Sequence, residues 1–369
     1  MQCAGDLLRL TPANKFVTGK ILNSDLEHVF RETDILWEEL RGQRIFISGG
    51  TGFFGCWLLE SFARINARLN LGATAVVLTR NPAAFQRKAP HLAACPSIQL
   101  YSGDIRSFDF PSGSFRFVIH AATDATEKAV IESPLETLDT IVGGTRHILD
   151  FARNCGAQGF LFTSSGAVYG KQPPEVARLS ETFRGAPDPA DPASSYGESK
   201  RLAETLCCIY AAKYGFACRI ARCFAFAGPY LPLDGHFAIG NFVCDAIRGE
   251  PIRIHGDGTP VRSYLYAADL AVWLWTILFR GENCQPYNVG SEREVSISEL
   301  ATAVVDALSP GLPVETAHRP VPGTLPLRYL PSTALAQNQL GLSEHFTLKE
   351  MITRMARWHE PSLQEEMKR

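Results

Sequence analysis

The chain has 369 residues, of which 46% are hydrophobic, and a formal net charge of −2 at pH 7, so it can bury one large core or two moderate ones. The charge is nearly balanced and forms no basic stripe, which argues against a nucleic acid partner. No apolar run reaches the ~18 residues of a membrane span, and no signal segment is recognisable at the N-terminus. We therefore expect a cytoplasmic protein with no membrane partner. The ten cysteines form no C-x-x-C pair, which favours buried thiols over disulfides or metal ligands, and no metal site is predicted.

The first segment of the chain, residues 1–42, precedes the first clear strand pattern. Apolar residues between Leu26 and Leu40, including Trp37, recur at helical spacing and predict a helix. We interpret this segment as an N-terminal extension that packs as an arm or makes an oligomer contact.

A glycine-rich turn follows the short apolar strand predicted at residues 44–48, and residues 56–59 begin a helix. Glycines in such a turn allow the backbone to approach a pyrophosphate closely, at the positive end of the helix. The pattern therefore predicts a dinucleotide-binding turn made of Gly49, Thr51, Gly52, Phe53, Phe54 and Gly55.

The next strand, residues 75–80, ends at Thr79 and Arg80. An acidic residue here would accept hydrogen bonds from the adenosine ribose, whereas Arg80 suits a 2′-phosphate. Arg80 could also stack on the adenine, so NAD stays possible and NADP is modestly favoured.

Two further strand ends fit the same cofactor. Asp104, followed by Ile105, could meet the adenine amino group, and the small residues Ala121, Ala122 and Thr123 would let the backbone lie along the cofactor.

A tyrosine–lysine pair lies further along the chain. Tyr196 and Lys200 are four residues apart, which places them on one face of a helix. We expect the ammonium group to lower the pKa of the tyrosine from about 10, so that the phenolate can take a proton from an alcohol. Ser165, at the end of the strand predicted at 159–165, could hold the substrate oxygen against this tyrosine.

Alternating strands and helices across residues 43–221 predict a Rossmann-type α/β fold with a doubly wound parallel sheet. Residues 222–369 are richer in loops with short helices, which indicates a smaller C-terminal α/β substrate domain, with a partial return to the sheet around 262–290.

The string Ser165-Gly-Ala-Val-Tyr-Gly170, together with residues 222–229, 256–266 and 287–291, resembles the extended short-chain dehydrogenases/reductases of the NAD-dependent epimerase/dehydratase (nucleotide-sugar) family. The resemblance covers residues 43–345. It implies a nucleotide-diphosphosugar substrate, a homodimer, and Ser165, Tyr196 and Lys200 as the catalytic residues. The substrate-binding residues that it implies are Ser165, Gly166, Ala167, Asn241, Arg262 and Arg319.

Two departures from the family pattern bear on the reaction. Sugar 4,6-dehydratases of this family carry an acidic pair where this chain has Gly166 and Ala167, and neither of these can move a proton. Ala225 stands where the family often has an asparagine that touches the sugar diphosphate, so an unusual substrate is possible.

The preferred hypothesis is a 4-epimerase type of enzyme that transfers a hydride transiently to bound NAD(P). Three alternatives stay open. The first is an NADPH-dependent reductase of a 4-keto-sugar nucleotide, and the second is a dehydratase acting by an atypical route through Asp124 and Glu127. The third is a non-catalytic dinucleotide-binding regulator.

Overall fold

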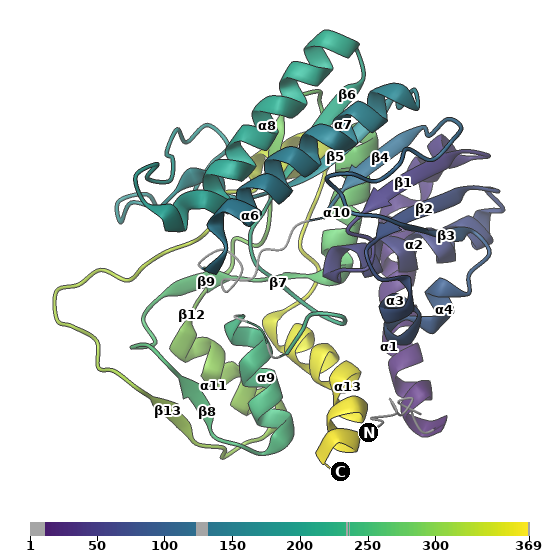
Figure 1. Cartoon of the computed structure of the whole chain (residues 1–369). Coiled ribbons are helices and arrows are strands. Elements are labelled where there is room, and N and C mark those ends of the chain that lie inside the picture. The colour runs from purple at the N-terminus through teal and green to yellow at the C-terminus, as the bar shows by residue number, and fades with distance from the viewer. Residues whose placement is uncertain (1–11, 123–131, 234, 236, 368–369) are drawn as a thin grey trace, which may run out of the picture.

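A parallel sheet forms the centre of the computed structural model, which describes residues 12–122, 132–233, 235 and 237–367. Seven strands of this described part pair in the order β11-β6-β5-β4-β1-β2-β3 (Figure 1). They are β1 (Arg44–Ser48), β2 (Thr74–Thr79), β3 (Ile98–Ser102), β4 (Phe117–His120), β5 (Gly159–Ser165), β6 (Ala217–Cys223) and β11 (Pro286–Val289). The chain winds outward in both directions from β1, which confirms the predicted doubly wound sheet and leaves a crevice between the ends of β1 and β4.

Helices cover both faces of this sheet (Figure 1). The helices α2 (Phe53–Leu69) and α10 (Ala267–Arg280) pack on one face, and α7 (Gly144–Asn154) and α8 (Ser195–Tyr214) pack on the other. Successive side chains of a strand point to opposite faces of the sheet, which explains the two apolar clusters. Ile45 and Ile47 of β1 enter one cluster and Phe46 enters the other. All but the last residue of α10 is buried, as expected from its apolar sequence.

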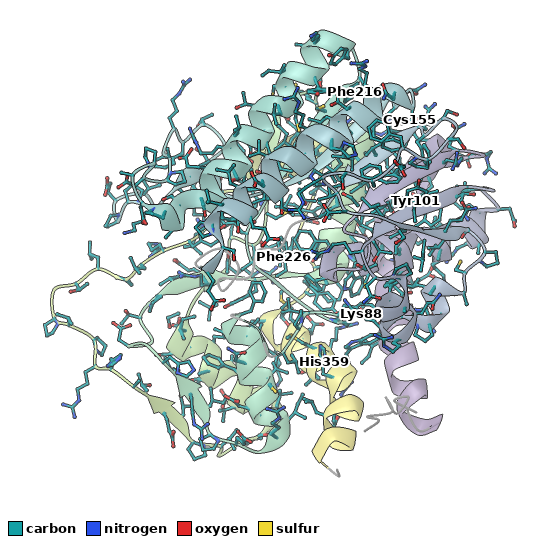
Figure 2. The ribbon with its side chains drawn as sticks, viewed as in Figure 1. Lys88, Tyr101, Cys155, Phe216, Phe226 and His359 are labelled. Atoms are coloured by element: carbon teal, nitrogen blue, oxygen red, sulfur yellow. The ribbon has the colours of Figure 1, made fainter. Side chains whose placement is uncertain are left out.

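A smaller part of the chain lies beyond the carboxyl ends of the strands (Figure 1). It contains α9 (Ala238–Arg248), α11 (Ile297–Leu308) and three two-stranded sheets. The pairs are β7 (Phe226–Ala227) with β10 (Leu265–Tyr266), β8 (Ile252–Ile254) with β13 (Val314–Thr316), and β9 (Val261–Ser263) with β12 (Glu294–Ser296). Phe226 of β7 lies on the side of this part that borders the main sheet (Figure 2). The chain returns to the main sheet through β11, beside β6.

The described part of the N-terminal segment, residues 12–42, packs against the body of the protein. Helix α1 (Pro12–Thr33) contacts α2, α10 and α13 (Leu348–Met367). His28 Nε2 lies 2.8 Å from Asp269 Oδ1 of α10, and the Tyr266 hydroxyl donates to Asp25 Oδ2 at 2.6 Å. Trp37 is fully buried in the short 3₁₀-helix η1 (Asp34–Leu40). Through these contacts residues 12–42 pack as an arm against the core.

The remaining described elements are short. They are α3 (Pro82–Lys88), α4 (Pro90–Ala93), α6 (Pro134–Leu138), the π-helical turn η2 (Asp139–Gly143), the 3₁₀-helices η3 (Gly166–Tyr169) and η4 (Pro192–Ser194), and α12 (Ala334–Leu340). Within the described ranges, no helix has the length and apolar content needed to cross a bilayer.

Candidate active site

The register of the sheet brings the carboxyl ends of the strands to one edge. Ser48 of β1 pairs with His120 of β4, and Ser165 of β5 pairs with Cys223 of β6. Two cavities open at this edge, and both are lined by Gly49, Gly52 and Ala121. A ligand that fills one cavity can therefore reach into the other.

The glycine-loop cavity, of about 370 Å³, lies beside the turn that follows β1. Most of the predicted cofactor residues line it: Gly49, Thr51, Gly52, Thr79, Arg80, Asp104, Ile105, Ala121 and Ala122. Phe53 and Phe54 line the second cavity instead. Thr123 lies outside the described residues, as do Asp124 and Glu127 of the dehydratase alternative.

The turn itself explains its glycines. Gly49 has φ +74°, and a Cβ there would lie 2.4 Å from the backbone carbonyl of Ala121. A Cβ on Gly55 would lie 2.3 Å from the Gly49 oxygen. Only glycine permits this close packing. Gly52 is the N-cap of α2 and makes no side-chain hydrogen bond to the first N–H groups of the helix. This end of α2 borders the cavity. This cradle fits the pyrophosphate of a dinucleotide.

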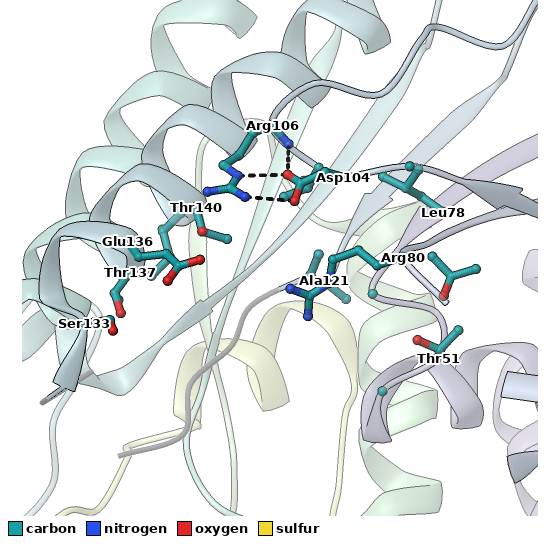
Figure 3. A pocket seen from close by; sticks show the side chains of 17 residues that line it. Thr51, Leu78, Arg80, Asp104, Arg106, Ala121, Ser133, Glu136, Thr137 and Thr140 are labelled. Carbon is teal, nitrogen blue, oxygen red and sulfur yellow. Dashed lines mark hydrogen bonds and ion pairs between the residues drawn. The ribbon is translucent and has the colours of Figure 1, made fainter. Parts of the chain in front are cut away.

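Charged side chains border the far end of the glycine-loop cavity. Arg80 extends into it between Thr51 and Asp104 (Figure 3). Asp104 Oδ1 and Oδ2 accept hydrogen bonds from the Arg106 guanidinium at 2.9 and 3.0 Å. These bonds hold the pKa of Asp104 below its usual value. The sequence reasoning did not foresee this ion pair, which fixes the carboxylate expected to meet the adenine.

The tyrosine cavity, of about 660 Å³, contains the predicted catalytic residues Ser165, Tyr196 and Lys200. Ser165 ends β5, and the other two lie in the first turns of α8. Of the predicted substrate-binding residues, Ala167 and Arg262 also line it.

Three predicted substrate-binding residues do not line this cavity. Asn241 is half-buried on α9, and Arg319 is exposed in the loop after β13. Gly166, which directly follows Ser165 at the start of η3, is buried. The structure therefore brings the three predicted catalytic residues together but leaves Asn241, Arg319 and Gly166 outside the cavity wall.

The pKa of Tyr196 differs from the expectation. Burial raises it to about 12, and the neighbouring Ser165 hydroxyl opposes this rise only in part. Burial also lowers the pKa of Lys200 to about 8. Lys200 Nζ donates to the Thr163 carbonyl at 2.8 Å and lies 5.9 Å from the centroid of the Tyr196 ring. In the protein alone the pKa of Tyr196 is therefore above its usual value and not below it, as predicted, because burial of the phenol is the dominant cause.

Aromatic residues that the sequence reasoning missed form much of the wall of the tyrosine cavity. They include Phe224, Phe226, Phe237, Tyr264 and Tyr329. Phe224 directly follows β6, so the rule that ligands bind at strand ends could have found it. Tyr329 comes from a long irregular segment, and no periodic pattern marks it.

His120 illustrates a buried polar residue with a structural role. Its Nδ1 lies 2.8 Å from Ser48 Oγ, and its Nε2 lies 3.1 Å from Thr145 Oγ1. Complete burial lowers its pKa to about 3, so the ring is neutral at physiological pH. It joins β4 to β1 and α7.

Comparisons with known proteins agree with this geometry. Residues 45–290 match the NAD dependent epimerase/dehydratase family. UDP-glucuronic acid decarboxylase 1 of Arabidopsis thaliana is 31% identical over 312 residues, which cover 85% of this chain and 68% of that protein. UDP-glucuronic acid decarboxylase 2 of the same plant is also 31% identical, over 319 residues that cover 86% of this chain and 68% of that protein.

Solved structures share the fold. The UDP-glucose 4-epimerase of Thermotoga maritima with UDP-glucose superposes with a TM-score of 0.73 at 21% identity, covering 87% of this chain and 99% of that one. The dTDP-glucose 4,6-dehydratase of Streptomyces venezuelae with bound NAD also superposes with a TM-score of 0.73, at 24% identity. The match covers 87% of this chain and 98% of that one. At these identities the likeness concerns the fold alone.

Proposed function

This chain belongs to the NAD-dependent epimerase/dehydratase family, and we propose that it is a nucleotide-diphosphosugar epimerase of the 4-epimerase type. The observation that carries the proposal is one continuous site. Ser165, Tyr196 and Lys200 line a cavity that shares Gly49, Gly52 and Ala121 with the glycine-loop cavity. A hydroxyl-bearing carbon beside Tyr196 would therefore lie near the end of a bound dinucleotide.

The residues of the glycine-loop cavity would hold the cofactor, with the pyrophosphate at the N-terminus of α2 and Arg80 at the adenosine end. When bound, the nicotinamide ring supplies a reversible hydride acceptor. The phenolate form of Tyr196 would take the proton of the sugar hydroxyl while Ser165 holds the oxygen. Return of the hydride to the opposite face of the carbonyl carbon, with return of the proton from Tyr196 to the oxygen, would invert the carbon without net oxidation.

Positions 166 and 167 support epimerisation over elimination. Gly166 and Ala167 directly follow Ser165, and neither carries a group that exchanges protons. Removal of water from the sugar needs an acid and a base beside the reacting carbons, whereas hydride transfer and return need only the groups already present.

Decarboxylation of a sugar uronic acid is the second candidate, and the likeness to the UDP-glucuronic acid decarboxylases favours it. Oxidation at the same carbon creates a ketone two bonds from the carboxylate. Such an acid loses carbon dioxide without a dedicated protein base, so the site's machinery would suffice for this reaction as well.

One assay separates the candidates. Purified protein, with no added cofactor, is incubated with UDP-, dTDP-, CDP- and GDP-hexoses and with UDP-glucuronic acid, and each product is followed by proton NMR and mass spectrometry. An epimer of unchanged mass supports the proposal. Loss of the mass of carbon dioxide supports decarboxylation, and loss of the mass of water supports a dehydratase.

A reductase would instead turn over only a 4-keto sugar and consume NADPH in step with product. A protein inactive in all these assays, whose Tyr196→Phe variant kept its full biological effect, would be a regulator.

We also infer a preference for NADP and a homodimer. Arg80 offers a charge for the 2′-phosphate, and calorimetric titration with NAD⁺ and NADP⁺ tests it. The apolar residues Leu135, Leu138, Leu202 and Ile209 of α6 and α8 are 43–78% exposed, which suits burial against a second copy. Light scattering should show a dimer that Ile209→Lys weakens, and a monomeric wild-type protein would contradict it.

A further inference from the structure

Gly166 and Tyr329 occupy adjoining space beside Ser165, and Tyr329 forms part of the wall of the tyrosine cavity. A Cβ on Gly166 would lie 2.5 Å from the Tyr329 hydroxyl oxygen and 2.8 Å from two ring atoms of Phe224. The rings of Tyr329 and Phe224 lie 4.7 Å apart between centroids. The residue after Ser165 therefore has no room for a side chain, because a phenol from a distant part of the chain fills that volume.

The backbone on both sides of Tyr329 is anchored. Tyr329 N–H donates to the Val261 carbonyl at 3.2 Å, and the Val261 N–H donates to the Leu327 carbonyl at 2.8 Å. On the other side, Leu330 N–H donates to Gln172 Oε1 at 2.9 Å. These bonds tie the segment to β9, which carries Arg262, and to the loop that follows η3. The phenol is thus held in place from two directions, which suits a group that must keep a fixed orientation.

Tyr329 lines the same cavity as Ser165, Tyr196 and Arg262. Its hydroxyl oxygen lies 2.5 Å from the position that a Cβ would take on Gly166, the residue that follows Ser165. Burial raises the pKa of Tyr329, and the Ser165 hydroxyl beside it lowers that pKa in part. At neutral pH the phenol is therefore protonated and acts as a hydrogen-bond donor.

Ser165 has a specific need for such a donor. A serine hydroxyl carries one proton and two acceptor lone pairs. One lone pair of Ser165 Oγ accepts the Ala167 N–H at 3.1 Å. A donor on the second lone pair would leave the Ser165 proton free to point toward the substrate oxygen, and a chain of such bonds polarises its members.

We propose that Tyr329 is a positioning residue of the reaction: its hydroxyl donates to Ser165 Oγ and directs the Ser165 proton at the substrate oxygen. Gly166 is required because any side chain there would displace the phenol. The role in turnover rests on the proposed hydride-transfer function, whereas the contact itself does not.

Tyr329→Phe tests the role in turnover. If the proposed function holds, kcat should fall by about 10- to 100-fold with KM changed by less than about 3-fold. In a Ser165→Ala background the same substitution should change kcat by less than about 2-fold, because the residue acts through Ser165. Tyr101→Phe, which removes a remote hydroxyl bonded to the Asp109 carbonyl, is the control and should keep wild-type kcat. An unchanged kcat in Tyr329→Phe, or equal losses in both backgrounds, would overturn the proposal.

Thermal unfolding tests the contact without any substrate. Gly166→Ala should lower Tm, and adding Tyr329→Phe should recover about 1–4 °C relative to the sum of the single effects, because the nearest clashing atom is gone. Ser165→Ala and Tyr329→Phe should likewise be non-additive in Tm. If no nucleotide sugar is turned over, the proposed function fails. The two double-mutant comparisons of Tm still test whether Tyr329 contacts Gly166 and Ser165. Additive losses of Tm in both double-mutant comparisons would overturn the proposed contact.

Discussion

The glycine-loop cavity depends on the absence of a side chain at Gly49, and this dependence can be measured against a matched control. Gly49 and Gly72 both have positive φ, +74° and +64°. A Cβ at Gly72 meets nothing within 4 Å, whereas one at Gly49 would lie 2.4 Å from the Ala121 backbone. Alanine at either position incurs the left-handed backbone cost, about 1–2 kcal/mol. Only Gly49→Ala adds an overpacking cost, about 1–3 kcal/mol.

These costs translate into melting temperatures. A chain of this length has an unfolding entropy of about 0.8 kcal/mol/K, so Gly72→Ala should lower Tm by about 1–3 °C and Gly49→Ala by about 3–6 °C. Differential scanning calorimetry measures both. In calorimetric titrations with NAD⁺ and NADP⁺, Gly49→Ala should raise Kd at least ~10-fold, since the shifted backbone forms the cradle, while Gly72→Ala should leave Kd unchanged. Equal losses of Tm and of affinity in the two variants would refute the reasoning.

Three further predictions address the catalytic base, acid stability and cofactor choice. Tyr196→Phe should lower turnover at least ~100-fold while cofactor Kd changes less than about 3-fold, and substantial residual turnover would exclude Tyr196 as the base. Because burial lowers the pKa of His120 to about 3, its stabilising contribution is complete above pH ~6.5 and is lost as pH falls below that value. Urea unfolding from pH 7 to 4 should therefore show a shallower loss of stability, by up to about 1.4 kcal/mol per pH unit, in His120→Asn than in wild type, and parallel curves would contradict this. Arg80→Asp should weaken NADP⁺ at least ~10-fold more than NAD⁺, and an equal effect on both would count against the NADP preference.

Short-range sequence patterns predict much of the fold. The apolar strands, the glycine turn at residues 49–55 and the four-residue spacing of Tyr196 and Lys200 each depend on neighbours along the chain, so their periodicity predicts strand, turn and helix face. Parallel strands joined by helices then place their carboxyl ends at one edge. The sequence was therefore sufficient to predict the parallel sheet and the placement of Ser165, Tyr196 and Lys200 in one site.

Long-range packing decided the rest. Tyr329 reaches the cavity that Ser165 lines because backbone hydrogen bonds to Val261 and Gln172 hold an irregular segment across the site. The pKa of Tyr196 depends mainly on how much water the surrounding walls exclude, and the spacing to Lys200 along the helix does not reveal this. Asn241 and Arg319 carry suitable side chains, but the paths of α9 and of the loop after β13 keep them off the cavity wall. A local pattern carries no information about such paths, since they depend on contacts between residues that lie far apart in the chain.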